Sequence, residues 1–142
     1  MQGKVIAVNS AAQRGIPKRN MGEGYLREGW GLEGDAHAGV WDRQVSILPL
    51  EAMALVPPAI RATFTDDDYT ENITMEGIPL NDLTMGKRLK IGEAEVEICH
   101  IGKETPKDTG KPYIVSREGR FGKVVKSGKI AVGDAVILLG SE

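Results

Sequence analysis

The apolar residues of this chain fall into short runs with a β-type pattern, and glycine and proline separate the runs. The runs cover residues 4–8, 45–48, 73–75, 87–91, 95–101, 120–126 and 135–139. Several short strands at this spacing are typical of an all-β barrel or sandwich. Strands and helices do not alternate regularly along the chain, which argues against a doubly wound α/β fold.

One helical pattern interrupts the strands, at residues 49–64. Leu50, Met53 and Ala54 share one face at helical spacing. Pro57 should end this helix, because the residue before a proline is disfavoured in the α region. A second short helical piece follows. The sequence therefore predicts short helices set between strands of a mainly β domain.

Residues 11–29 carry no periodic run and predict a long irregular connection. Loops of this length in a compact domain are usually functional or disordered. Its basic residues Arg14, Lys18 and Arg19 are open to two interpretations: they contact an anion, or they are solvated.

A glycine-rich loop leads into the strand at residues 45–48 and carries the most concentrated candidate chemistry. The loop contains Asp35 and His37, and Arg43 stands just before the strand. Glycine lets a ligand approach the main chain closely, and a polar loop on a rigid strand is a common way to build a site. The alternative is an ordinary turn in which Asp35 bonds its own backbone.

Composition places the chain among soluble globular proteins. Its 142 residues suit a single domain, with 41% apolar and 27% charged residues. No apolar run reaches the roughly 18–20 residues of a membrane span, and the N-terminal stretch lacks the pattern of a signal peptide. One cysteine excludes an internal disulfide. We therefore expect a cytoplasmic protein, with no membrane association.

The net charge of −2 argues against general nucleic-acid binding, but charge is distributed unevenly. Residues 103–129 hold eight basic and three acidic side chains. Such a segment either binds an oxoanion or forms a solvated face. Only Tyr113 and Phe121 interrupt it, so a stacking platform for single-stranded nucleic acid is poorly supported.

Several chemistries are excluded by the residues present. The chain has no nucleophile elbow, no P-loop and no dinucleotide fingerprint. Two histidines and one cysteine cannot build a four-ligand structural zinc site. Asp35 and His37 could supply at most two of the ligands that a metal ion needs. Cys99, the only thiol, falls on the strand face that also carries Glu95 and Glu97, which is the face expected to point to solvent.

Five blocks of the sequence, in order and with family-like spacing, resemble the MOSC domain, which occurs at the C-terminus of eukaryotic molybdenum cofactor sulfurases and as small stand-alone bacterial proteins. The blocks are GLEGDAHAG, RQVSIL, ENITMEG, KIGEAEVEICHIGKE and SREGRFGKVVKSGKIAVGD. The resemblance covers nearly the whole chain, and it implies one domain spanning residues 1–142. It also implies a β-barrel resembling the β-barrel domain of pyruvate kinase.

The resemblance further implies binding of the molybdenum cofactor, molybdopterin, and handling of sulfur. In the fused sulfurases that sulfur comes from a separate pyridoxal-phosphate domain, for which this chain has no room. The implied partners are therefore a cysteine desulfurase-type sulfur donor and a molybdoenzyme acceptor. The oligomeric state stays open, and so does the question of whether the protein is itself an enzyme.

By position, the resemblance assigns cofactor binding to Asp35, His37, Arg43 and the pair Glu71 and Asn72. Arginine can hold a phosphate through two parallel bonds, and an asparagine offers both a donor and an acceptor. We expect these two segments of candidate site residues, at residues 35–37 and 71–72, to lie at the same end of the barrel.

The chain departs from the family pattern at Thr105. Relatives carry a cysteine there, after Gly-Lys-Glu, which is read as the sulfur carrier or metal ligand. A threonine cannot form a persulfide and is a poor ligand for a soft metal. Thr105 remains a candidate cofactor contact, and Cys99 is the only candidate for a substitute thiol.

The leading hypothesis is a MOSC-type barrel that binds molybdenum cofactor or a related anionic ligand, with sulfur transfer as an open possibility. The alternative is a non-catalytic barrel that binds a small anion or a partner, with a decayed site at Thr105. A hydrolase with a metal at Asp35 and His37 is a third and weaker hypothesis.

Overall fold

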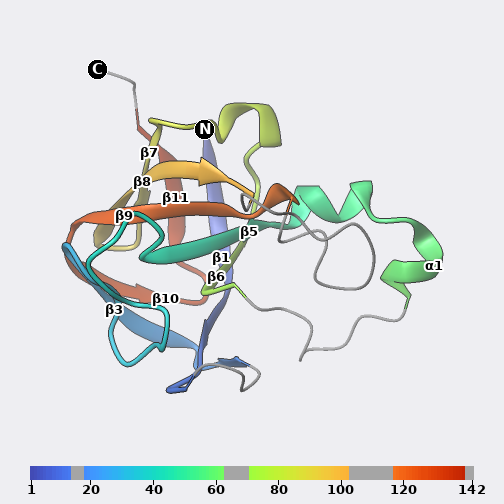
Figure 1. The fold of residues 1–142 in the computed structure, drawn as a ribbon. Coiled ribbons are helices and arrows are strands. Elements are labelled where there is room, and N and C mark those ends of the chain that lie inside the picture. The colour runs from blue at the N-terminus through green and yellow to red at the C-terminus, as the bar shows by residue number, and fades with distance from the viewer. Residues whose placement is uncertain (14–17, 63–70, 103–116, 140–142) are drawn as a thin grey trace.

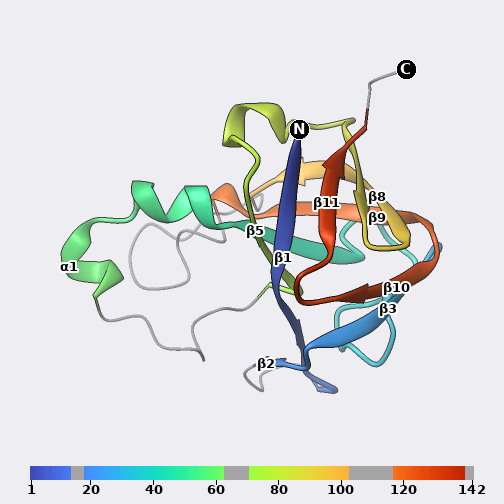
Figure 2. The ribbon, with the colours of Figure 1, turned by 180° about the vertical axis from the view of Figure 1, so that it is seen from behind.

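The computed structural model describes residues 1–13, 18–62, 71–102 and 117–139. Thr105 lies outside the described residues. Within them, seven strands form a closed barrel (Figures 1 and 2). In their order around the barrel, these strands are β1 (Gln2–Ser10), β11 (Ala135–Leu138), β7 (Arg88–Ile91), β8 (Ala94–Ile101), β9 (Arg120–Lys126), β5 (Val45–Pro49) and β6 (Ile73–Glu76). The prediction of a mainly β barrel is confirmed.

The barrel closes where β1 meets β11, two strands that come from opposite ends of the sequence. They are antiparallel, with Gln2 opposite Ile137, and they lie side by side in Figure 2. Among the described strands of the barrel, only β5 and β6 pair in parallel. A parallel pair needs a crossover connection, and residues 50–72 provide it.

The start of the crossover contains the predicted short helices. They are η1 (Leu50–Leu55), which is a 3-10 helix, and α1 (Pro58–Arg61), which points away from the barrel in Figure 1. Val56 is extended, with ψ of 128°, as the proline after it requires. A third short helix, η3 (Leu80–Asp82), follows β6.

The barrel interior is filled mainly by aliphatic side chains, which alternate with more exposed positions along β7 and β8. Ile47, Ile73 and Met75 are at most 1% exposed, and β7 follows a strict pattern of exposed and buried residues. A smaller cluster of Leu48, Ala52, Val56 and Phe121 packs η1 against the outside of the barrel. Each fully buried aliphatic side chain contributes about 1.5–3 kcal/mol to folding.

The irregular connection predicted at residues 11–29 is wrong. That segment contains β2 (Arg19–Asn20) and β3 (Glu23–Arg27). Strand β3 pairs with β10 (Gly128–Ala131) and with β4 (Gly31–Leu32) to form a second, three-stranded sheet. The sequence pattern misleads because the two inward positions of β3 hold Gly24 and Leu26, so only one of them is apolar and no alternation of apolar and polar residues is visible.

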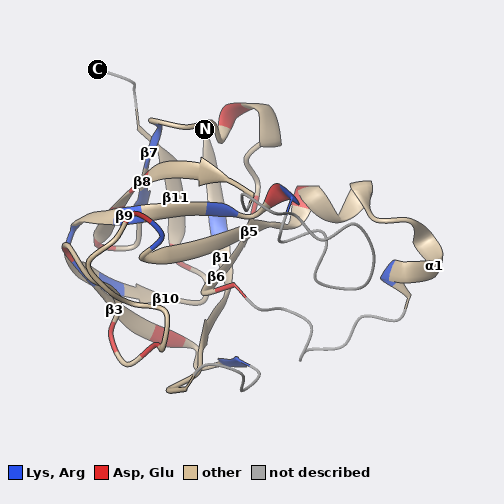
Figure 3. Cartoon of the chain, viewed as in Figure 1, with Lys and Arg blue, Asp and Glu red and all other residues tan. Residues whose placement is uncertain are grey.

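The basic segment shows a solvated face in its described part. Lys126 Nζ lies 3.8 Å from Glu95 Oε2 on the neighbouring strand, and Lys123 stands opposite Glu97. Figure 3 accordingly shows basic and acidic residues interspersed over these strands. The anion-binding interpretation of this segment therefore finds no support in β9.

Gly122 allows β8 and β9 to approach each other, next to the irregularity in register between Ile98 and His100. A Cβ atom at Gly122 would collide with the carbonyl oxygen of Glu97. Gly122→Val should therefore lower the free energy of unfolding by about 1–3 kcal/mol in urea denaturation, the usual cost of overpacking. Gly39→Ala is the matched control, because a Cβ there meets only Trp41 at 3.5 Å. Equal stability of the two variants would contradict this account.

No helix in the described residues is long and apolar enough to cross a membrane.

Candidate functional site

Asp35 is the buried centre of the glycine-rich loop, with a side chain only 1% exposed. Its Oδ1 accepts hydrogen bonds from Lys18 Nζ at 2.6 Å and from the amide of Ala11 at 3.2 Å. Its Oδ2 accepts one from the amide of His37 at 3.1 Å. A buried carboxylate must be paired and hydrogen-bonded to be tolerated. Asp35 therefore ties the loop to the end of β1 and to Lys18.

The surroundings of Asp35 act on its pKa in opposite directions. Burial raises the pKa, but hydrogen bonds from Lys18 and Asn72 and from the amide of Ala11, together with the charge of Lys18, outweigh that effect. The net pKa lies below the ordinary value of 3.8. Asp35 is therefore an anion at neutral pH, and it is neutralised by Lys18.

Lys18 joins the two predicted site residues Asp35 and His37. Its ammonium is 5% exposed and lies 3.1 Å from His37 Nδ1. An ammonium group has no acceptor, so Nδ1 must accept this bond and the imidazole proton resides on Nε2. The His37 side chain itself is 44% exposed. Sequence reasoning grouped Lys18 with other basic residues and did not place it in the site.

Asn72 fastens three strands together beside Asp35. Its Oδ1 accepts from the amide of Ser46 at 3.0 Å, and its Nδ2 donates to the carbonyl of Asn9 at 3.4 Å. Asn72 also hydrogen-bonds Asp35. The segments at residues 35–37 and 71–72 therefore lie at the same end of the barrel, as predicted. Asn72 itself is 1% exposed, so it positions the site from within.

Glu71 is fully buried and engages the start of β6. Its Oε1 accepts a hydrogen bond from Thr74 Oγ1 at 2.6 Å, and Asn9 Nδ2 donates to its backbone carbonyl at 3.2 Å. These contacts make Glu71 a supporting residue of the same polar network. A direct contact between its side chain and a ligand would require the network to open.

Arg43 is held on the far side of Ser46 from this network. Its Nη1 donates to the carbonyl of Gly102 at 3.1 Å, and its guanidinium lies 4.7 Å from the ring centroid of Phe121. Phe121 stands opposite Ser46 in the pairing of β9 with β5. A half-buried guanidinium stacked on an aromatic ring is preorganised to bind an oxoanion.

The neighbouring loop residue Asp42 is anchored by a hydrogen bond with His100. Its Oδ2 lies 2.7 Å from His100 Nε2, and this bond holds the pKa of Asp42 below its ordinary value. Together with the contact of Arg43 to Gly102, it fixes the end of the loop against β8. His100 therefore serves to position the loop.

Cys99 has the opposite environment from a reactive thiol. Burial raises the pKa of its thiol, against a smaller lowering effect of Lys123, and its Sγ lies 3.6 Å from the carbonyl of Glu97. A sulfur carrier needs a thiolate, which a raised pKa disfavours. The geometry gives the tentative assignment of Cys99 no support.

Both tryptophans of the chain are exposed, Trp30 by 38% in the turn between β3 and β4 and Trp41 by 43% on the glycine-rich loop. The Trp41 Nε1 donates to the carbonyl of His37 at 3.1 Å. This bond places an indole ring next to the Lys18–Asp35–His37 set. Sequence reasoning missed Trp41. Its position between His37 and Arg43 was the available signal.

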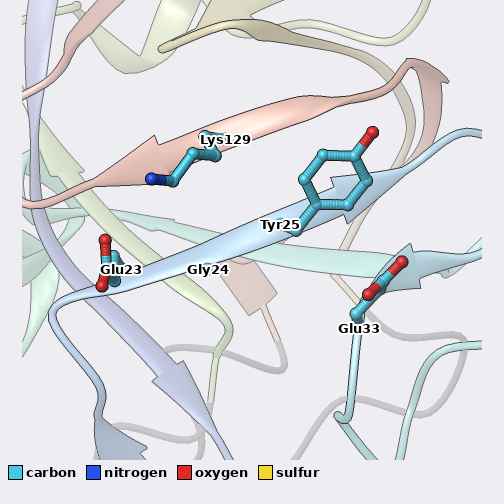
Figure 4. Close-up of a pocket in the computed structure, with 5 residues that line it drawn as sticks. All are labelled: Glu23, Gly24, Tyr25, Glu33 and Lys129. Carbon is cyan, nitrogen blue, oxygen red and sulfur yellow. The ribbon is translucent and has the colours of Figure 1, made fainter.

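A separate hollow of about 750 Å³ lies on the outer face of the small sheet (Figure 4). It is lined by Glu23, Gly24, Tyr25, Glu33 and Lys129. Its mixture of acidic and basic side chains favours no single class of ligand. It shares no residue with the site around Asp35.

Metal ligands are not gathered anywhere in the described ranges. No group of three or more His, Cys, Asp or Glu side chains there could hold a metal ion. Lys18 instead brings a positive charge to within hydrogen-bond distance of both Asp35 and His37. This arrangement disfavours a cation at that point and gives no support to a metal-dependent hydrolase.

The geometry defines a β-barrel protein in which Lys18, Asp35 and His37 are joined beside the exposed indole of Trp41, while Arg43 is held separately against Gly102 and Phe121. The MOSC domain matches the chain over residues 34–137, and the chain belongs to this family. No sequence among curated proteins matches it significantly.

Solved structures share the fold at low sequence identity. The YuaD protein from Bacillus subtilis superposes with a TM-score of 0.71 at 20% identity, covering 96% of this chain and 94% of that one. YiiM from Geobacillus stearothermophilus superposes with a TM-score of 0.70 at 18% identity, covering 97% of this chain and 75% of that one. YiiM from Escherichia coli superposes with a TM-score of 0.67 at 21% identity, covering 99% of this chain and 70% of that one. The expected family and fold are thus confirmed.

Proposed function

We propose that this protein binds the molybdenum cofactor, or a closely related anionic ligand, at the site around Asp35. The MOSC family is associated with this cofactor and with sulfur transfer to it. The observation that carries the proposal is the Lys18–Asp35–His37 set, because it fixes an ammonium and a partly exposed imidazole on one side of the loop. Arg43, at the end of the same loop, would supply a second point of attachment for an anionic ligand.

The residues present fit the anionic part of such a cofactor. Its phosphate suits the guanidinium of Arg43, which presents several donors in a fixed plane. His37 offers the donor Nε2–H, because Lys18 occupies Nδ1. When bound, the cofactor would supply a molybdenum centre able to accept or release sulfur.

The chain's own residues bind and orient in this proposal. Asp35 compensates the charge of Lys18 and thereby fixes the tautomer and direction of the His37 ring. Asn72 and Ser46 hold the loop and the strands in register beneath it. Preorganisation of this kind reduces the entropy that a ligand must overcome on binding.

Sulfur transfer needs a carrier that the described residues do not offer. Cys99 has a raised pKa, and Thr105 stands where relatives have a cysteine. A cysteine desulfurase-type partner would therefore have to carry the sulfur on its own thiol, and a molybdoenzyme would be the acceptor. These partners follow from the family association and the missing thiol.

A second candidate function follows from the same missing thiol. The protein would be a non-catalytic barrel that binds a small anion, with the sulfur chemistry of the site lost. The raised pKa of Cys99 favours this alternative over a thiol-based sulfurase.

Metal and pterin analysis of freshly purified protein separates the two functions. Stoichiometric molybdenum, together with a fluorescent pterin after oxidation, is the expected result for a cofactor protein. Protein free of both that binds inorganic phosphate as tightly as added cofactor would overturn the proposal and leave the anion-binding barrel.

Arg43→Lys should weaken binding of phosphorylated pterin about tenfold by calorimetry. A lysine is a point charge that cannot reproduce two parallel hydrogen bonds, and such bonds contribute about 1.5–3 kcal/mol each. Arg88→Lys is the matched control, because Arg88 is exposed and pairs with Glu97 on the barrel surface. Unchanged affinity in the Arg43 variant would remove this residue from the site.

A further inference from the structure

Trp41 presents an open aromatic surface at the edge of the proposed site. It is 43% exposed, so a large part of the indole is open to solvent. An exposed indole that is also fixed in place contacts planar ligands at low entropic cost.

The indole of Trp41 is fixed by two neighbours in the same loop. Its Nε1 donates to the carbonyl of His37 at 3.1 Å. Gly39 lies under the ring edge, since a Cβ there would be 3.5 Å from Trp41 Cδ1. The loop is fixed in turn, because the Gly39 amide donates to the carbonyl of Trp30 at 2.9 Å and Asp42 contacts His100. The ring therefore holds one orientation.

The ring lies beside His37, whose side chain is 44% exposed and carries the donor that suits an anion. Arg43 follows two residues after Trp41 in the same loop. A ligand whose anionic group bonds the His37 imidazole therefore has the π-face of the indole next to it, and the single polar donor of the indole is already used. The combination is complementary to a molecule with a negative group attached to a flat ring system.

We infer that Trp41 is a ligand-stacking residue and that the site takes phosphorylated planar heterocycles, with the pterin ring lying against the indole. This inference rests on the proposed function and deepens it, because it names the residue that recognises the ring as distinct from the anionic group. Stacking of a base on an aromatic side chain changes affinity roughly tenfold or more.

The test measures binding of neopterin monophosphate by calorimetry in three variants. Trp41→Ala should weaken binding about tenfold, and Trp41→Phe should weaken it less, because a smaller ring still stacks. Trp30→Ala is the matched control: Trp30 is similarly exposed, but it lies in the turn between β3 and β4 and contacts the loop through its backbone carbonyl, which the substitution keeps. The affinity of the Trp30→Ala variant for neopterin monophosphate should equal that of the parent protein.

Inorganic phosphate separates the inference from the proposed function. Trp41→Ala should leave phosphate affinity unchanged, because phosphate has no ring to stack. Equal losses for phosphate and neopterin monophosphate would show a general disturbance of the loop and overturn the inference. If Trp41→Ala binds neopterin monophosphate like the parent, the inference fails and the proposed function stands. If the parent protein binds no pterin, the proposed function itself fails.

Adenosine monophosphate tests the class of ring. Because the inference covers phosphorylated planar heterocycles, the nucleotide should also bind, and Trp41→Ala should weaken its binding about tenfold. Nucleotide binding that Trp41→Ala leaves unchanged would contradict stacking on the indole.

Discussion

Asp35→Asn should lower the free energy of unfolding by about 3–5 kcal/mol at neutral pH, as measured by urea denaturation. The substitution leaves the ammonium of Lys18, with a side chain only 5% exposed, without its counter-charge. Breaking a buried ion pair by removing one partner costs about this much, because the remaining charge stays desolvated. The double variant Lys18→Met, Asp35→Leu should recover much of the loss.

Asp42→Asn is the matched control for this effect. Asp42 also carries a short bond to a basic side chain, but it is exposed, and exposed pairs contribute at most about 1 kcal/mol. Equal losses in the Asp35 and Asp42 variants would mean that burial does not make the Lys18–Asp35 pair important.

The difference between parent and Asp35→Asn should also depend on pH. The folded-state pKa of Asp35 lies below its ordinary value of 3.8, so the unfolded chain binds the proton first as pH falls. The stabilisation by the carboxylate is complete well above pH 3.8 and is lost as pH falls through the folded-state pKa. Stability curves of parent and variant should therefore converge in acid.

Arg120→Met should lower the free energy of unfolding by about 2–5 kcal/mol in the same assay. Arg120 is 4% exposed, and it donates to the carbonyls of Leu83 at 2.9 Å and Leu80 at 3.0 Å. Methionine fills the space but removes these two bonds and the bond from Nη1 to the carbonyl of Glu118 at 2.6 Å. The Leu80 carbonyl keeps its bond from the Leu83 amide, whereas the Leu83 carbonyl loses the Arg120 donor, and a buried group left without a partner costs about 1–3 kcal/mol. The segment containing η3 would lose its attachment to β9.

The control for Arg120 lies on the same strand. Lys126 is 60% exposed and pairs with Glu95 at 3.8 Å, so Lys126→Met should change stability by less than about 1 kcal/mol. Similar losses for both variants would contradict the structural role of Arg120. The two residues belong to one basic segment of the sequence, and only their burial distinguishes them.

The sequence predicts the barrel strands well because their pattern is local. Val96 and Ile98 are buried between exposed or half-buried neighbours, and such alternation is visible in a single stretch of residues. Strand β3 was missed for the converse reason. Gly24 interrupts it, and its pairing partners lie in β4 and β10, so the information that makes it a strand is in the tertiary contacts.

The residues of the candidate site likewise fall into those that the sequence revealed and those that only the fold revealed. Asp35, His37 and Arg43 were found because they lie within one short loop of distinctive composition. Lys18 was not placed with them, because its contact with Asp35 depends on how the chain returns from β1, which no periodicity records. Glu71 and Asn72 were found by resemblance, but their buried roles in fastening β5, β6 and β1 emerge only from the fold.

The pairing of β1 with β11 has a consequence for how the chain reaches its native state. Gln2 lies opposite Ile137, so the barrel cannot close until nearly the whole domain has left the ribosome. Contacts between residues so distant in sequence are slow to form, on the scale of milliseconds to seconds. Until then β1 and β7 keep unpaired edges, which are the surfaces through which incomplete β proteins associate. The nascent domain is therefore expected to depend on chaperones more than a helical protein of equal length does.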